Sequence, residues 1–168
     1  AGKSSRFISK GYDGPKWSYI TGKKTMIEHV LDMFIKLNPI FHLVISKSQE
    51  KYSHKIQFLE NLPYKKKIHV IKDHNRGPTF SALQIKNIDK NSETIVCYCD
   101  FYLDWNCINF IKEARQYDAA ISSFKGFHPA SFGDTLYAYI KTDKSLNFLK
   151  LKEKASFTNK RENEHAST

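Results

Sequence analysis

Segments with helical and strand-like patterns alternate between residues 25 and 116, and this alternation restricts the folds that the chain can adopt. Apolar residues recur with helical spacing in one set, and short apolar runs with β-branched residues form the other. The helical segments are 25–36, 48–60, 79–88 and 105–116, and the strand-like runs are 41–46, 68–71 and 94–99. Such repeats require right-handed crossovers between parallel strands. We therefore predict an α/β fold with three layers, α/β/α, around a mostly parallel, Rossmann-like sheet.

The last third of the chain has a different rhythm. Residues 118–124, 134–142 and 146–154 have strand patterns with no helix between them, which predicts an antiparallel portion near the C-terminus. No linker divides the chain, so we expect a single domain over residues 1–168. The chain begins inside a loop that normally follows a buried strand, and its last residues stop as if another strand were about to start. We therefore expect a fragment that lacks its first strand and its C-terminal part.

Local signals refine two helices and one strand. Thr25 and Glu28 have the spacing of a capping box, which predicts a helix start. Asp104 is a candidate N-cap for the helix over 105–116. The run TIVCYC at 94–99 is apolar enough to be a central strand covered on both faces.

Composition narrows the classes of partner. The formal net charge of +10 favours anionic partners. The sequence has neither a zinc-finger spacing nor an RNP-like aromatic motif, so we do not expect nucleic acid as a partner. Three cysteines do not form a disulfide framework, and no apolar run approaches the roughly 18 residues that span a bilayer. We predict a cytoplasmic protein without a membrane span. Its oligomeric state stays open, and a homo-oligomer is one of the alternatives.

Residues 2–16, GKSSRFISKGYDGPK, have the composition of a polyphosphate-binding loop. Glycine and successive backbone N–H groups form a concave site for an anion, and these residues are Gly2, Lys3, Ser4 and Ser5. Arg6 offers a planar fork that suits a departing pyrophosphate, and Lys16 offers a compact charge for the reacting phosphate oxygens. We assign Arg6 and Lys16 to catalysis by charge stabilisation.

Two further segments supply candidate residues. Asp100 ends the apolar run 94–99 and is expected at the carboxyl edge of the sheet, where ligands bind in open α/β folds. A carboxylate there can hold Mg²⁺ together with substrate phosphates. The helix start at Gly77, Pro78 and Thr79 can present backbone N–H groups to the base or ribose of a nucleotide.

These segments, in this order, resemble the nucleoside-diphosphate-sugar pyrophosphorylases, the sugar-phosphate nucleotidyltransferases. The matching motifs are the loop AGKSSRF, the pair Pro15-Lys16, GKKTMIEHVL from Gly22, RGPTFSAL at 76–83, VCYCD at 96–100, the pair Glu153-Lys154 and the closing Ala166-Ser167-Thr168. The loop departs from the family, because many members keep a second glycine and a Thr before the Arg.

The resemblance implies a GT-A-like fold and a magnesium-dependent activity in nucleotide-sugar and polysaccharide biosynthesis. The enzyme would transfer a nucleoside monophosphate from a nucleoside triphosphate, by resemblance a pyrimidine one, to a phosphorylated sugar or similar small acceptor, and release pyrophosphate. Asp100 would bind the metal, with the family's second metal-binding Asp expected beyond residue 168. The residues that the family places around the acceptor are His128, Glu153, Lys154 and Ser167.

Two other functions remain open. A glycosyltransferase of similar architecture would consume a nucleotide-sugar, but it would need an Asp-x-Asp pair, and Asp100 and Asp104 have a different spacing. A basic module that binds nucleotide or nucleic acid without catalysis is the second alternative. A pyrophosphate-release assay distinguishes all three.

Overall fold

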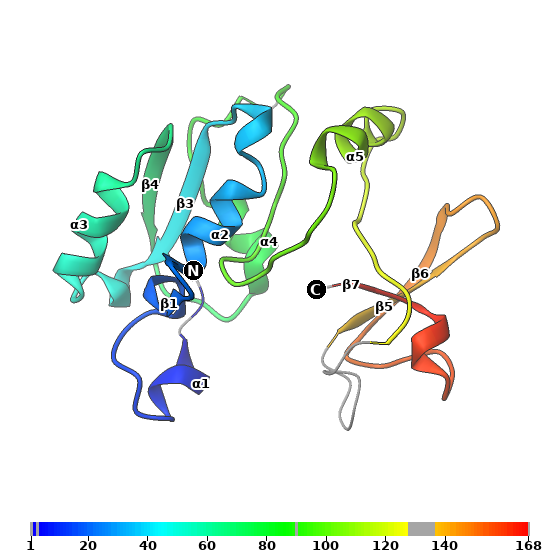
Figure 1. The fold of residues 1–168 in the computed structure, drawn as a ribbon, viewed down its shortest axis with the longest axis horizontal. Helices are drawn as coiled ribbons and strands as arrows, with labels where there is room; N and C mark the ends of the chain where they lie inside the picture. Colours follow the sequence, from blue (N-terminus) through cyan, green and yellow to red (C-terminus); the bar gives the residue numbers. More distant parts are fainter. Residues whose placement is uncertain (1, 3, 90, 128–136, 168) are drawn as a thin grey trace. The chain divides into compact units, whose positions relative to one another are not determined.

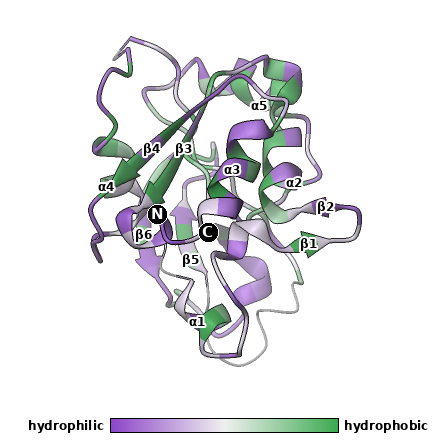
Figure 2. Cartoon of the chain, turned by 90° about the vertical axis from the view of Figure 1, so that its left-hand side faces the viewer, coloured by the Kyte–Doolittle hydropathy of each residue, from purple (hydrophilic) through white to green (hydrophobic). Residues whose placement is uncertain are grey.

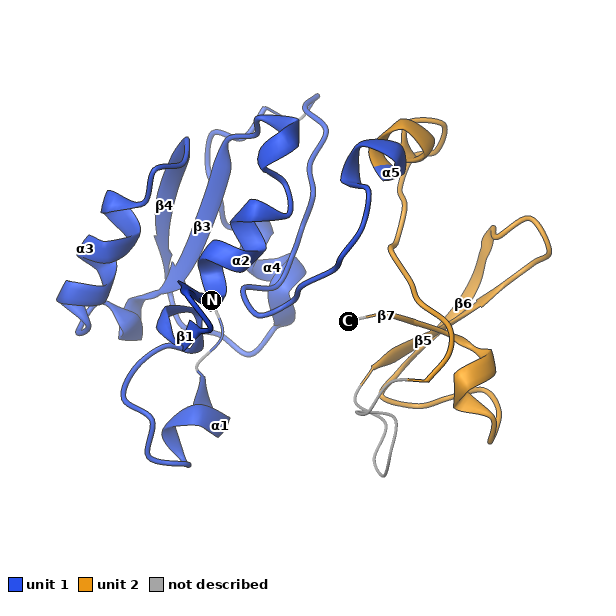
Figure 3. Ribbon diagram, viewed as in Figure 1, with its two compact units in different colours: residues 1–110 blue, residues 111–168 orange. Residues whose placement is uncertain are grey.

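The computed structural model describes residues 2, 4–89, 91–127 and 137–167, and it divides into two compact units (Figures 1 and 3). Unit 1 comprises residues 1–110 and unit 2 comprises residues 111–168. The first unit contains α1 (Ser5–Ile8), β1 (Ile20–Thr21), β2 (Lys24–Thr25), α2 (Met26–Asp32), β3 (Phe41–Ser46), α3 (Ser53–Asn61), β4 (Lys66–Ile71) and α4 (Gly77–Leu83). Helix α5 (Cys107–Ala114) spans the boundary, and β5 (Ala138–Thr142), β6 (Phe148–Glu153) and β7 (His165–Ser167) follow.

A parallel pair of strands is the centre of unit 1. Strands β3 and β4 pair in parallel over six positions, from Phe41 beside Lys66 to Ser46 beside Ile71. Figure 2 shows hydrophobic colour over part of each strand, interrupted by hydrophilic residues. The buried core next to this sheet takes residues from α2, β3, α3 and the turn after Pro15, namely Trp17, Ile27, Leu31, Ile45, Leu59 and Leu62. The prediction of a β–α–β unit with a parallel sheet is therefore confirmed for this part of the chain.

The start of α2 follows its sequence signal. The side-chain oxygen of Thr25 accepts a hydrogen bond from the Glu28 N–H, and the Glu28 carboxylate accepts one from the Thr25 N–H. This reciprocal pair is the predicted capping box. Residues 33–36 do not continue α2, because a single 3₁₀ turn over Ile35–Leu37 and a left-handed Asn38 (φ 47°) end the helical segment.

Two predicted strands are absent from the part of the chain that the structure describes. Residues 94–99 form no strand, and Val96 is 55% exposed rather than central in a sheet. Residues 118–124 contribute only an isolated bridge between Phe124 and Ala166. Both segments are apolar and contain β-branched residues, but a strand also needs a partner to pair its N–H and C=O groups.

Helix α5 is capped by Asn106 and not by the predicted Asp104. The Asn106 side chain accepts a hydrogen bond from the Asn109 N–H at 3.1 Å.

Unit 2 has an antiparallel sheet with the strand order β6–β5–β7. Its core consists of the central strand and one residue of β7, which are Ala138, Tyr139, Ile140 and Ala166. The predicted strands at 134–142 and 146–154 correspond to β5 and β6, so the antiparallel portion near the C-terminus is confirmed. The three-layer arrangement and the single domain over residues 1–168 stay predictions. No helix in the described part of the chain is both long and apolar enough to cross a bilayer.

Candidate functional site

A hydrogen bond between its two ends closes the predicted phosphate loop. The Lys16 backbone N–H donates to the Ser4 hydroxyl at 2.9 Å, and Ser4 adopts a left-handed conformation (φ 53°). Ser5 begins the four-residue helix α1, on which Arg6 is exposed. The left-handed backbone at Ser4 is one that glycine adopts without strain, and it falls in the segment where the loop departs from the family pattern.

Helix α3 and the turn before it also hold this loop. Gln49, only 5% exposed, donates its side-chain amide to the Gly2 carbonyl at 2.9 Å. Lys55 of α3 donates to the Asp13 carbonyl at 2.7 Å. Neither Gln49 nor Lys55 is among the residues predicted from the sequence. Gln49 had a usable signal, because it follows the carboxyl end of a parallel strand, where α/β folds place their ligands.

Lys16 and Asp100 are in contact, although 84 residues separate them in the sequence. The Lys16 Nζ atom lies 2.6 Å from an Asp100 carboxylate oxygen, with the two side chains 23% and 33% exposed. The chain therefore brings together the predicted catalytic lysine and the predicted metal ligand, while Ser4 holds the Lys16 backbone. Arg6 has no side-chain hydrogen bond or ion pair within the described residues.

Two thiols, those of Cys97 and Cys99, lie just before Asp100 in the sequence. Burial raises the pKa of the Cys97 thiol to about 11, with the neighbouring Cys99 and Asp100 adding to the effect. Burial also raises the pKa of Cys99. Magnesium is a hard ion that prefers oxygen ligands to sulfur, and Asp100 supplies an oxygen ligand here.

The donor set at Asp100 fits magnesium only with help from a substrate. No group of three or more His, Cys, Asp or Glu side chains suited to a metal occurs among the described residues. Magnesium commonly binds one or two carboxylates together with substrate phosphates. The Asp100 carboxylate beside the predicted phosphate loop could supply the one protein ligand that such a magnesium site needs.

The start of α4 is an exposed turn with a defined conformation. Gly77 has φ +81°, and a Cβ atom there would meet nothing within 4 Å, so glycine is required by the backbone rather than by space. Pro78 occupies the first helical turn, and Thr79 is exposed. The three predicted nucleotide-binding residues therefore share one accessible turn.

Three of the four predicted acceptor-binding residues lie close together in unit 2. Glu153 on β6 and Ser167 on β7 both pair with Ala138 of β5. Residues directly opposite in an antiparallel sheet point to the same face, so two polar side chains flank a small residue. Lys154 follows β6 with φ +53°, and the Ser167 hydroxyl donates to the Ser122 carbonyl at 2.8 Å. The remaining predicted residues, Lys3 and His128, lie outside the described residues.

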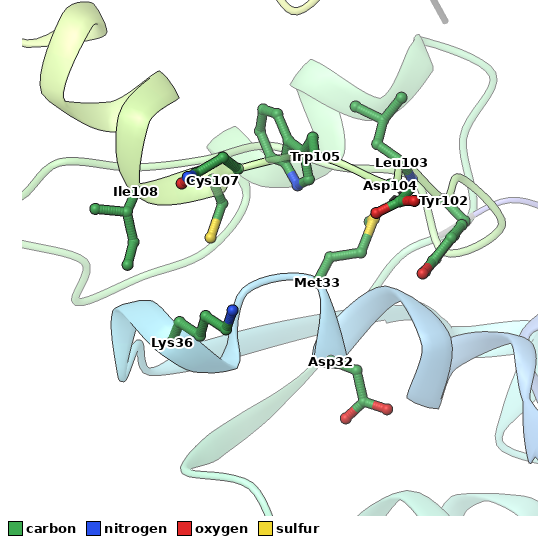
Figure 4. A pocket seen from close by; sticks show the side chains of 10 residues that line it. Asp32, Met33, Lys36, Tyr102, Leu103, Asp104, Trp105, Cys107 and Ile108 are labelled. Atoms are coloured by element: carbon green, nitrogen blue, oxygen red, sulfur yellow. Dashed lines mark hydrogen bonds between the residues drawn. The ribbon is translucent and has the colours of Figure 1, made fainter.

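Unit 1 also contains a cavity of about 420 Å³ (Figure 4). The Nε1 atom of Trp105 is buried there without a hydrogen-bond partner in the described chain. The lining residues are Asp32, Met33, Lys36 and residues 102–108. None of the predicted site residues that the structure describes lines this cavity, and neither Lys16 nor Asp100 is among its lining residues.

Comparison with known proteins gives a structural relative. No family model matches the chain, and no curated protein matches its sequence. The solved structure of the nucleoside-diphosphate-sugar pyrophosphorylase from Vibrio cholerae RC9 superposes with a TM-score of 0.66 and 17% identity. The match covers 99% of this chain and 68% of the pyrophosphorylase. At this identity the likeness concerns the fold alone: the chain and this pyrophosphorylase are distantly similar in their mixed α/β fold.

Proposed function

We propose that this chain is a nucleotidyltransferase that transfers a nucleoside monophosphate from a nucleoside triphosphate to a phosphorylated sugar or similar small acceptor. Pyrophosphate is the second product, and the reaction depends on magnesium. The observation that carries the proposal is the 2.6 Å contact between Lys16 and Asp100 at the closed end of the phosphate loop. The shared fold with a nucleoside-diphosphate-sugar pyrophosphorylase adds support.

The chemistry needs electrostatic stabilisation more than proton transfer. The acceptor phosphate is already largely ionised at neutral pH, because the second pKa of a phosphate monoester is about 6. Its oxygen attacks the α-phosphorus, and the bond from that phosphorus to the bridging oxygen breaks. The electron pair leaves with pyrophosphate, so no general base is required.

The side chains of the loop meet these demands by position and charge. The Lys16 ammonium group and the Asp100 carboxylate neutralise each other in the structure. On substrate binding, Lys16 exchanges the carboxylate for phosphate oxygens, and exposed Arg6 takes the β- and γ-phosphates in bidentate fashion. A magnesium ion held by Asp100 and the phosphates would neutralise charge on the leaving group.

The remaining predicted residues bind the two substrates. Backbone N–H groups of residues 2–5 hold the triphosphate, and the turn at Gly77, Pro78 and Thr79 holds the base or ribose. The acceptor-binding residues are His128, Glu153, Lys154 and Ser167. Lysine supplies a positive charge for the acceptor phosphate, whereas Glu153 and Ser167 can bind hydroxyl groups.

Pyrophosphate release tests the proposal. The chain is incubated with each nucleoside triphosphate and a panel of sugar phosphates, with magnesium or with a chelator. We expect release only with a matching pair and magnesium, with a pyrimidine triphosphate preferred. Lys16→Ala should lower turnover by about a hundredfold or more, whereas Lys24→Ala should not, because Lys24 forms its ion pair with Asp32 instead.

Two other results would replace the proposal. Consumption of a nucleotide-sugar without pyrophosphate release would indicate a glycosyltransferase. Saturable nucleotide or nucleic-acid binding without turnover under any of these conditions would indicate a binding module.

A further inference from the structure

The part of the phosphate loop that leads to Lys16 contains two glycines with positive φ. Gly11 has φ +83° and Gly14 has φ +104°. Glycines allow this path, but they also increase the conformational freedom that the loop must lose before it can grip a ligand. A loop of this composition needs contacts from the rest of the domain to stay in one conformation.

Lys55 supplies such contacts from α3. Its Nζ atom donates to the Asp13 carbonyl at 2.7 Å. A Cβ atom built on Gly14 would lie 2.6 Å from the same Nζ atom, so the ammonium group occupies the space that any side chain at Gly14 would need. The lysine and the glycine are therefore complementary, and both lie just before Pro15 and Lys16.

The same ammonium group also lies over one residue, Tyr19, of the aromatic cluster that holds the other half of the loop. It lies 5.0 Å from the ring centroid of Tyr19, within range of a cation–π interaction. The Tyr19 ring packs on Phe7 at 5.6 Å and on Tyr12 at 5.2 Å. Phe7 follows Arg6 on α1. One cation thus connects the turn that precedes Lys16 with the helix that carries Arg6.

We propose that Lys55 is a positioning residue that fixes the phosphate loop, so that Arg6 and Lys16 are arranged for a triphosphate before it binds. This inference rests on the proposed function. Lys55 acts through the loop, because its Nζ atom is engaged by the Asp13 carbonyl and the Tyr19 ring. An arranged loop binds more tightly because less conformational entropy is lost on binding.

The test compares four variants of the whole chain. Lys55→Met removes the charge and the donor but keeps an apolar side chain of similar length, and Lys55→Arg restores a cation and a donor. Lys51→Met is the matched control, because Lys51 lies 5.0 Å from the Tyr52 ring and is placed near α3 without a hydrogen bond to the loop among the described residues. Lys55→Gln is measured alongside, so that a neutral polar variant is at hand if Lys55→Met does not fold.

Two readouts are recorded for each variant. The first is amide hydrogen exchange at residues 11–16 without ligand, and the second is the dissociation constant of the nucleoside triphosphate with magnesium. We expect Lys55→Met to speed exchange at these residues and to weaken nucleotide binding about three- to tenfold, which matches the typical net contribution of one hydrogen bond. Lys55→Arg should recover most of both effects, and Lys51→Met should change neither.

The outcomes separate the two proposals. Unchanged exchange, or faster exchange with wild-type nucleotide affinity, overturns the positioning role of Lys55. If the wild-type chain binds no nucleoside triphosphate, the proposed function fails, and Lys55 has no triphosphate site to arrange whatever the exchange shows. If the wild-type chain binds nucleotide and Lys55→Met does so equally well, only the inference about Lys55 fails.

Discussion

Replacing Lys16 with glutamine should increase the affinity of the nucleotide-free chain for a divalent metal. In the structure, the Lys16 ammonium group lies beside the Asp100 carboxylate at 2.6 Å. A metal ion that binds Asp100 must therefore displace this cation and then lie next to it. The substitution removes the competitor and leaves the carboxylate in place.

The size of the effect follows from the geometry of the pair. For two unit charges 2.6 Å apart, Coulomb's law with the dielectric constant of water gives about 1.6 kcal/mol. Because the side chains are 23% and 33% exposed, the net contribution falls to roughly 0.5–1 kcal/mol. That corresponds to a factor of about two to five in affinity. Loss of the repulsion between the ammonium group and the metal acts in the same direction, so we expect an increase of about three- to tenfold.

Electron paramagnetic resonance of free Mn²⁺ measures this affinity without turnover. Asp100→Asn defines the background from other carboxylates. Lys24→Gln is the matched control, because Lys24 and Asp32 form a similar ion pair at 2.5 Å outside the proposed site. Equal or weaker Mn²⁺ binding by Lys16→Gln, or a gain that persists in the double variant with Asp100→Asn, would refute the competition between lysine and metal.

Three further predictions concern stability, each measured by urea unfolding. Thr25→Ala removes the capping box of α2 and should cost about 1 kcal/mol; an unchanged midpoint would contradict the role of the cap. Gly77→Ala places a Cβ atom on a left-handed backbone without a steric clash and should lower the free energy of unfolding by about 1–2 kcal/mol. The control is Gly2→Ala, at a position without positive φ, which should change the free energy of unfolding by less than about 0.5 kcal/mol. Burial lowers the pKa of His42 and of His69, and their ring nitrogens lie 2.9 Å apart. The unfolded chain therefore binds more protons at these two residues than the folded chain does. The free energy of unfolding should fall as the pH drops below 6.5, the pKa of both histidines in the unfolded chain. Replacing both histidines with glutamine should reduce this pH dependence, and an unreduced slope would assign it to other groups.

Sequence patterns predicted the elements whose signals are local. The strand over 41–46 matches β3 residue for residue, and the spacing of Thr25 and Glu28 identified the helix start that the structure shows. Both depend on residues close along the chain, for which apolar periodicity and capping chemistry are direct evidence.

The errors arose where a second segment of the chain decides the outcome. The run 94–99 has the composition of a buried strand, yet it pairs with neither β3 nor β4 in the described structure. Composition records how apolar a segment is, but not which partner takes its hydrogen bonds.

The sequence indicated which types of residue form the candidate site, but only partly which of them touch one another. Lys16 and Asp100 were chosen separately for phosphate and metal chemistry, and the structure adds that they meet. Lys55 could not be predicted from its own segment, because its importance comes from the loop that it touches. Gln49 was indicated only by its place after the carboxyl end of β3, and its contact with Gly2 could not be predicted.

The capping box has a consequence for the order in which the protein folds. Thr25 ends the short hairpin β1–β2 and also starts α2, and the Met26 N–H donates to the Tyr19 carbonyl at 2.9 Å. These contacts close small loops, whereas the pair of Lys16 and Asp100 closes one of 84 residues, which costs about 2 kcal/mol more in chain entropy. We therefore expect the hairpin and helix to be largely formed in the folding transition state, with a φ-value near one for Thr25→Ala and near zero for Asp100→Asn. The chain would then acquire its catalytic charges last, onto a framework that is already in place.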